Sequence, residues 1–177
     1  RAGVIWVYIG PPEQQPPPPR LEWATLPAGQ VYASRRLQEC NWLQVMEGGL
    51  DSSHLSWLHQ GSLMSDPILG IGGVREDRRI LEVMAADRSP RFQAIDSPAG
   101  LVLGARRSAG PGQYYWRITQ YILPCFNIIA PFGDQLLNAQ AWVPMDDHNC
   151  WSWAVNYQMT APLSATEREF MRRGAGL

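Results

Sequence analysis

Tyr114-Tyr-Trp-Arg-Ile-Thr-Gln-Tyr-Ile-Leu123 is one of several short runs, rich in aromatic and β-branched residues, that decide the fold of this chain. Such residues favour strands, and Ser-Pro, Gly-Pro-Gly and Asp-Asp turn signals separate the runs. The predicted strands are residues 31–39, 80–85, 91–95, 101–106, 114–123, 135–143 and 151–157. The connections after residue 79 are short, so the sequence predicts an antiparallel meander.

Two segments show helical patterns. Residues 41–50 place Trp42, Val45 and Met46 along one apolar side, although Gly48-Gly49 weakens this helix near its end. Ser164-Ala-Thr-Glu167 is a capping-box sequence and predicts that a helix begins there. The predicted fold class is therefore α+β, with a curved antiparallel sheet and helices packed on it.

The beginning of the chain predicts a boundary between domains. Residues 2–9 are expected to form a strand whose partners lie upstream. A proline-rich tract follows over residues 10–20, and proline favours an extended, semi-rigid spacer.

Composition limits the classes of function. The chain has 177 residues, of which 45% are hydrophobic and 18% charged, which is enough for one sizeable core. The formal net charge is -1 and the fifteen basic residues, all arginine, are scattered, so we expect no nucleic-acid partner and no anionic membrane surface. No apolar run approaches the ~18 residues of a membrane helix, and the three cysteines are too widely spaced for a zinc site. We expect a soluble cytoplasmic protein with free thiols.

The most informative stretch for function is Glu47-Gly-Gly-Leu-Asp51-Ser-Ser-His54-Leu-Ser-Trp-Leu-His59, which holds two of the three histidines. We expect one helix, packed on the sheet, to carry this cluster. Neutral imidazoles with a carboxylate suit a non-haem ferrous ion that keeps open positions for O₂ and substrate. On a regular helix, residues five apart differ in direction by roughly 140°. His54 and His59 can therefore share a metal only if the helix widens or ends between them.

Asp51 allows two interpretations. It precedes His54 by three residues, so its carboxylate can accept the second N–H of a metal-bound imidazole and fix its orientation. Alternatively, Gly48-Gly49 ends one helix and Asp51 caps the next. Both roles need a carboxylate, so both remain open at this stage.

The spacing Glu47-x3-Asp51-x2-His54-x4-His59, preceded by Asn41-Trp42, resembles the mononuclear-iron motif of Rieske non-haem iron oxygenase alpha subunits. The flanking residues 37–44 and 115–119 are most similar to the phthalate 4,5-dioxygenase branch. The resemblance implies that residues 1–10 end a Rieske domain and residues 11–30 form a linker. Residues 31–177 would begin a helix-grip catalytic domain with the iron pocket.

By this resemblance, His54 and His59 are iron(II) ligands. Asp51 would connect the iron site to a [2Fe–2S] cluster on a neighbouring subunit of a homo-oligomeric, trimeric ring. The Cys-x-His and Cys-x2-His pair that holds such a cluster is absent from this sequence, so the cluster would belong to a missing upstream domain. The third iron ligand would be an aspartate beyond Leu177. Asp146-Asp147 is expected to serve a turn, with His148 exposed beside it.

The implied partners are a ferredoxin or reductase component, O₂ and an aromatic, carboxylated substrate. Arg117 is the first candidate to meet the carboxylate, with Arg106 or Arg107 next. Two rival functions remain: a non-catalytic helix-grip module that binds an apolar ligand, and a zinc hydrolase that uses the same histidines. The substrate, and the choice among dihydroxylation, monohydroxylation and demethylation, stay open.

Overall fold

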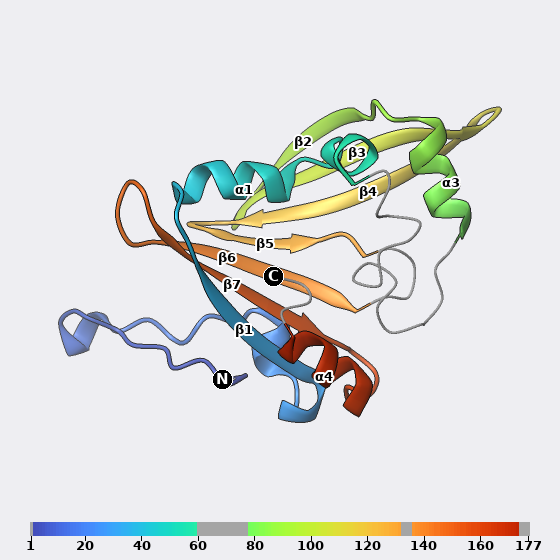
Figure 1. The fold of residues 1–177 in the computed structure, drawn as a ribbon. Helices are drawn as coiled ribbons and strands as arrows, with labels where there is room; N and C mark the ends of the chain where they lie inside the picture. The colour runs from blue at the N-terminus through green and yellow to red at the C-terminus, as the bar shows by residue number, and fades with distance from the viewer. Residues whose placement is uncertain (1, 60–77, 132–135, 174–177) are drawn as a thin grey trace.

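The computed structural model describes residues 2–59, 78–131 and 136–173. Its centre is a seven-stranded antiparallel sheet with strand order β1-β7-β6-β5-β4-β3-β2 (Figure 1). The strands are β1 (Val31–Gln38), β2 (Arg91–Ser97), β3 (Gly100–Gly110), β4 (Gln113–Ile122), β5 (Phe126–Ile129), β6 (Leu137–Pro144) and β7 (Cys150–Tyr157). Strands β2 to β7 are neighbours in chain order, so the predicted α+β class and antiparallel meander are confirmed.

The first strand lies beside the last one. Val31 pairs with Tyr157 and Gln38 pairs with Cys150, so β1 runs antiparallel along the whole of β7. The chain leaves this edge of the sheet a few residues before α1 (Trp42–Leu50) begins. The order of the strands therefore places the conspicuous histidine segment, which follows α1, over the sheet.

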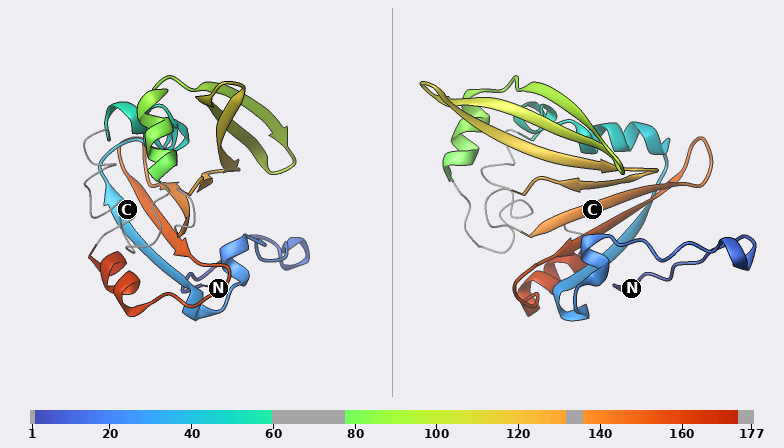
Figure 2. Two further views of the ribbon diagram at one scale, coloured as in Figure 1. Left: turned by 90° about the vertical axis from the view of Figure 1, so that its right-hand side faces the viewer. Right: turned by 180° about the vertical axis from the view of Figure 1, so that it is seen from behind.

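Three helices cover one face of the sheet, here called the inner face: α1, α2 (His54–Trp57) and α3 (Arg78–Ala86) (Figures 1 and 2). Helix α1 begins where the Asn41 side chain accepts a hydrogen bond from the backbone N–H of Leu43. Its buried Met46 packs with Trp142 of β6 and Cys150 of β7. The predicted helix over residues 41–50 is confirmed.

Residues 80–85, predicted to form a strand, belong to helix α3, so that prediction was wrong. Ile80, Leu81 and Met84 lie on one helical side and pack against Leu55 and Tyr115. A run of six residues with this composition fits either a buried strand or one face of a helix, and only packing decides between them. Strand β5 was missed, since it has only four residues.

The capping box predicts the last helix correctly. In α4 (Ala165–Arg172) the Ser164 side chain accepts from the backbone N–H of Glu167, and the Glu167 carboxylate accepts from the backbone N–H of Ser164. Arg168 donates to the carbonyls of Ala28 and Gly29, which holds α4 beside the start of β1.

The N-terminal segment packs on the opposite, outer face of the sheet (Figure 2). Residues 2–9 form no strand in the structure, and Trp6 packs against Trp23 with ring centres 6.3 Å apart. The predicted strand was expected to pair with residues upstream of this chain, so it stays a prediction. Three short 3₁₀ turns follow, η1 (Pro12–Gln14), η2 (Glu22–Thr25) and η3 (Ala28–Gln30). Tyr157 donates to the Glu22 carboxylate at 2.8 Å and anchors η2. The proposed domain boundary stays a prediction.

Composition also predicted the state of the cysteines. Cys40, Cys125 and Cys150 are free thiols, and the last two are buried. None of the described helices is long and apolar enough to cross a membrane.

Candidate functional site

The two histidines of the conspicuous stretch converge. Helix α1 ends at Leu50, and α2 contains only His54 to Trp57, so the helical path ends before His59. The two imidazole ring centres lie 5.2 Å apart, with their planes at 70°. The predicted end of the helix between the histidines is confirmed, whereas the expected single helix carrying the whole cluster is two helices.

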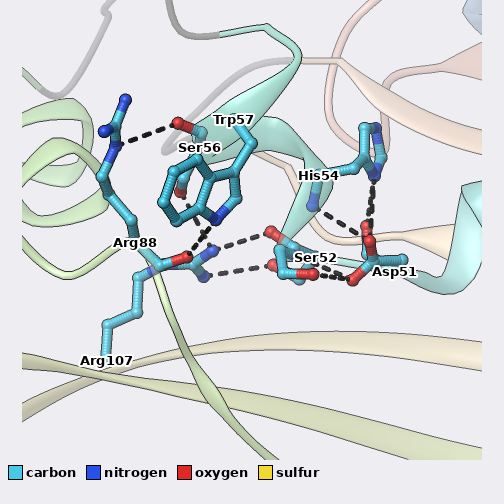
Figure 3. Close-up of polar contacts among 8 residues, drawn as sticks. Asp51, Ser52, His54, Ser56, Trp57, Arg88 and Arg107 are labelled. Atoms are coloured by element: carbon cyan, nitrogen blue, oxygen red, sulfur yellow. Dashed lines mark hydrogen bonds and ion pairs between the residues drawn. The ribbon is translucent and has the colours of Figure 1, made fainter.

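Asp51 performs two tasks with different atoms (Figure 3). Its carboxylate accepts from the backbone N–H of Ser53 at 2.7 Å, from the Ser53 hydroxyl, and from the backbone N–H of His54 at 3.0 Å. Its backbone carbonyl accepts from Nδ1 of His54 at 2.6 Å, whereas the nearest carboxylate oxygen is 3.9 Å from Nδ1. The carboxylate therefore caps the turn that starts α2, and the carbonyl orients the imidazole.

This hydrogen bond determines the tautomer of His54. A carbonyl oxygen can only accept, so in a neutral imidazole Nδ1 carries the proton and Nε2 keeps its lone pair. Figure 3 shows that the second ring nitrogen of His54 points away from Asp51. An imidazole held through Nδ1 by a carbonyl is a common arrangement for a metal ligand.

The spacing of the two rings fits a shared metal ion. Two imidazoles bound to one ion at about 2.1 Å have ring centres roughly 4.5–5.5 Å apart. The observed 5.2 Å lies within that range. The chemistry of the donors, two neutral nitrogens, also suits ferrous iron or zinc.

The Asp51 carboxyl is kept in its anionic form. Partial burial raises its pKa, but the hydrogen bonds from Ser53 and His54 together outweigh that effect, so the net pKa lies below the ordinary value of 3.8. Its side chain is 38% exposed. A negative charge therefore stands at the surface beside His54.

Helix α2 is too short to be stable by itself, because one turn gains too few hydrogen bonds to offset its ordering entropy. Arg107 of β3 holds it from below (Figure 3). The guanidinium is fully buried and donates to the Ser52 carbonyl at 2.7 Å, the Ser52 hydroxyl at 3.1 Å and the Asp87 carbonyl at 3.0 Å. Ser56 also donates to the Met84 carbonyl of α3 at 3.0 Å.

A second arginine clamps the other end of this turn. Arg88 donates to the Ser56 carbonyl at 3.3 Å, and its guanidinium carbon lies 4.6 Å from the centre of the Trp57 ring. The Trp57 indole N–H in turn donates to the Arg88 carbonyl at 3.2 Å. Sequence patterns did not reveal these contacts, which connect α2 to the loop between α3 and β2.

The histidines line a cavity of about 620 Å³ on the inner face of the sheet. Asp51, His54 and His59 contribute to one part of its wall. The sheet contributes polar side chains that the sequence did not single out, namely Arg36, Gln38, Thr119, Asn138, Gln140, Ser152 and Asn156. Apolar lining comes mainly from Val45, Leu50, Leu55, Ile129, Leu136, Trp142, Phe170 and Met171.

The three candidate arginines lie in different parts of the structure. Arg117 lines the cavity, is 2% exposed and donates to the Ala130 carbonyl at 2.6 Å. Burial lowers the pKa of the Arg117 guanidinium. Arg106 lies on the outer face, 4.4 Å from the ring centre of Tyr114, and the structure does not bring it to the cavity. Arg107 supports α2 and does not line the cavity.

The third metal ligand stays a prediction. Within residues 2–59, 78–131 and 136–173, no group of three His, Cys, Asp or Glu side chains could hold a metal. Asp146 accepts from the backbone N–H groups of His148 and Asn149, which confirms the predicted turn, and His148 is exposed. The aspartate predicted beyond Leu177 falls outside the described residues.

Comparison with known proteins matches the chain to one family model and to oxygenase subunits of dioxygenases. A family model described as LigXa C-terminal domain like matches residues 7–177. The oxygenase subunit of 3-chlorobenzoate-3,4-dioxygenase from Comamonas testosteroni is 31% identical over 93% of this chain and 38% of its own length. The phthalate 4,5-dioxygenase oxygenase subunit from Pseudomonas putida is 29% identical over 99% of this chain and 40% of its own length. The chain thus spans about two fifths of these relatives.

Among solved structures, dicamba monooxygenase bound to 3,6-dichlorosalicylic acid aligns with a TM-score of 0.49 and 12% identity. The alignment covers 81% of this chain and 44% of that protein.

Proposed function

This chain belongs to the LigXa C-terminal domain like family, and from that premise we propose that it forms the catalytic part of a terminal oxygenase that hydroxylates an aromatic substrate. The observation that carries the proposal is the 5.2 Å separation of the His54 and His59 rings at the wall of the cavity. These residues would hold a ferrous ion, together with a carboxylate from outside these 177 residues. Such an ion supplies open coordination positions for O₂ and substrate.

The proposed substrate is an aromatic carboxylate. The relatives named above act on 3-chlorobenzoate and on phthalate, which are both aromatic carboxylates. Arg117 would attract the carboxylate, because a desolvated guanidinium in a cavity wall favours an anion that can accept two parallel hydrogen bonds. Leu55, Ile129 and Trp142 would supply apolar walls for the ring.

Asp51 is the proposed link to an electron donor. Its carboxylate is 38% exposed and anionic, and it lies beside His54. A neighbouring subunit could therefore approach it from outside. We propose a homo-oligomeric ring in which a ferredoxin or reductase supplies electrons through a [2Fe–2S] cluster carried by another part of the full-length protein.

The test is the iron content of the purified full-length protein and of three variants. His54→Ala and His59→Ala should each lose most of the iron, because each removes one of two nitrogen ligands from these 177 residues. His148→Ala is the matched control, since His148 is exposed at the β6–β7 turn, and it should keep its iron. Normal iron loading in either of the first two variants would refute the ligand assignment.

The two rival functions make different predictions in the same preparation. A non-catalytic module that only binds a ligand in the 620 Å³ cavity needs no iron, so it would purify without stoichiometric metal. A zinc hydrolase would contain zinc and act without O₂ or reductant. An oxygenase consumes O₂ in step with product and stops when the reductant is omitted.

A further inference from the structure

We propose that Asn138 and Asn156 form an amide pair that orients the substrate by binding a neutral group that both donates and accepts a hydrogen bond, such as a ring hydroxyl. The inference deepens the proposed function and rests on it, because it names the substrate as an aromatic acid that carries a hydroxyl substituent. Asn138 and Asn156 stand directly opposite each other on β6 and β7. Both line the cavity that His54 and His59 also line.

The two side-chain amides contain two C=O and two NH₂ groups, and the hydrogen bond between them uses one of each. The Asn138 amide N–H donates to Oδ1 of Asn156 at 2.8 Å. In the described part of the chain, Oδ1 of Asn138 and Nδ2 of Asn156 are buried without a hydrogen-bond partner. Asn156 as a whole is 7% exposed. A buried polar group without a partner destabilises a folded protein, so an unsatisfied acceptor and an unsatisfied donor on two paired residues that line one cavity favour a ligand.

The conclusion does not depend on which way the two amides are turned. If the oxygen and nitrogen of both side chains are exchanged, the internal hydrogen bond runs from Asn156 to Asn138 instead. One carbonyl and one NH₂ group still remain. The pair therefore presents one acceptor and one donor in either arrangement.

This combination selects among substituents on an aromatic ring. A carboxylate only accepts and would be repelled by the free amide oxygen, whereas a methyl group would leave both amide groups unsatisfied. A hydroxyl can donate to the oxygen and accept from the nitrogen. Arg117, from β4 in the same cavity, suits the carboxylate, so the guanidinium and the amide pair fit two different substituents.

A structural role would be the competing explanation, because a hydrogen bond between the side chains also joins β6 to β7. The two explanations differ in a ligand preference. A purely structural pair affects stability alone, whereas a recognition pair changes the ratio of affinities for two ligands that differ in one substituent.

The experiment measures binding of 3-hydroxybenzoate and 3-methylbenzoate to the full-length protein by calorimetry, under nitrogen and without reductant, so that no turnover occurs. The wild type should bind the hydroxy compound about tenfold more tightly. The double variant Asn138→Leu/Asn156→Leu should reduce the ratio to about one. It removes both amides together, so it leaves no orphaned partner and is the variant expected to fold. Gln120→Leu, on the exposed outer side of β4, should leave the ratio unchanged.

A ratio near one in the wild type, no binding of either acid, or an unchanged preference in the double variant would overturn the proposal. Thermal melting of each variant establishes that it is folded before its affinities are compared. The outcome can be separated from that of the proposed function. A full-length protein that lacks iron would refute the oxygenase, whereas the ratio of affinities would still test whether the amide pair recognises a hydroxyl group.

Discussion

The imidazole of His54 is oriented by the backbone carbonyl of Asp51, at 2.6 Å from Nδ1, and not by the Asp51 carboxylate. A backbone carbonyl is present whatever side chain stands at position 51. The orientation of His54 and the charge of Asp51 can therefore be separated by mutation.

Asp51→Asn in the full-length protein should leave the iron content nearly intact and strongly reduce turnover. The asparagine oxygen can still accept from one of the two backbone N–H groups that Asp51 caps, and the carbonyl still holds His54. The negative charge and the other of these two hydrogen bonds are lost. Asp51→Ala is the comparison, because it also removes the cap and should lower the free energy of unfolding by about 1 kcal/mol. Equal loss of iron and turnover in Asp51→Asn would argue against a role for the charge in electron transfer.

Arg107 and Arg106 provide a matched pair of substitutions on opposite faces of β3. Arg107→Leu should lower the free energy of unfolding by about 3 kcal/mol, because it leaves the buried Ser52 and Asp87 carbonyls without their donor. It should also reduce iron content, since the turn that carries His54 loses its support. Arg106→Leu removes only contacts with Tyr114 and Trp116 and should change the free energy by less than about 1 kcal/mol.

Urea unfolding of Arg107→Leu and Arg106→Leu measures the two changes in the free energy of unfolding, and metal analysis measures their iron content. If Arg106→Leu proved as destabilising as Arg107→Leu, the support of α2 by Arg107 would not explain the position of His54.

These two arginines also show how far the sequence can predict the site. Adjacent residues of a strand point to opposite faces, so one of them had to face inward, but only the register of the folded sheet says which. Arg106 pairs with Trp116 and Arg107 with Tyr115, which places Arg107 under α2. The sequence offered no signal for its four hydrogen bonds, which are the three described above and one to the Ser56 hydroxyl at 3.4 Å. Their acceptors lie 20 to 55 residues away in the chain.

The histidines were predictable for a physical reason that the arginines lack. The five-residue spacing of His54 and His59 requires a helix end if the rings are to meet, and that is a local property. The Asn138–Asn156 pair was not predictable, because it depends on the register between β6 and β7. Local patterns thus indicated the proposed metal centre, whereas the residues of the cavity wall can be known only from the pairing of the strands in the folded sheet.

The two glycines of α1 should respond in opposite directions to alanine. A Cβ atom at Gly49 would lie 2.4 Å from the edge of the Trp142 ring, so α1 packs this closely on β6 only because Gly49 has no side chain. Gly49→Ala should lower the free energy of unfolding by about 1–3 kcal/mol. Gly48→Ala meets nothing within 4 Å and should raise it by about 0.5–1 kcal/mol, the ordinary gain in an exposed helix. Thermal unfolding of the two variants checks the signs, and destabilisation by both would contradict the close packing at Gly49.

The dependence of stability on pH should identify the Asp51 carboxylate. Its pKa in the folded protein lies below the ordinary value of 3.8 because hydrogen bonds from Ser53 and His54 outweigh the effect of burial. A depressed pKa contributes stability that is present above the unfolded pKa and is lost as the pH falls through the folded one. The stability of the wild type relative to Asp51→Asn should therefore be constant above about pH 5 and shrink on further acidification. Urea unfolding of both proteins between pH 7 and about pH 3 measures this difference, in which the other titrating groups cancel. A difference that grows as the pH falls would mean that burial outweighs the hydrogen bonds, and that Asp51 takes up a proton more readily in the folded state.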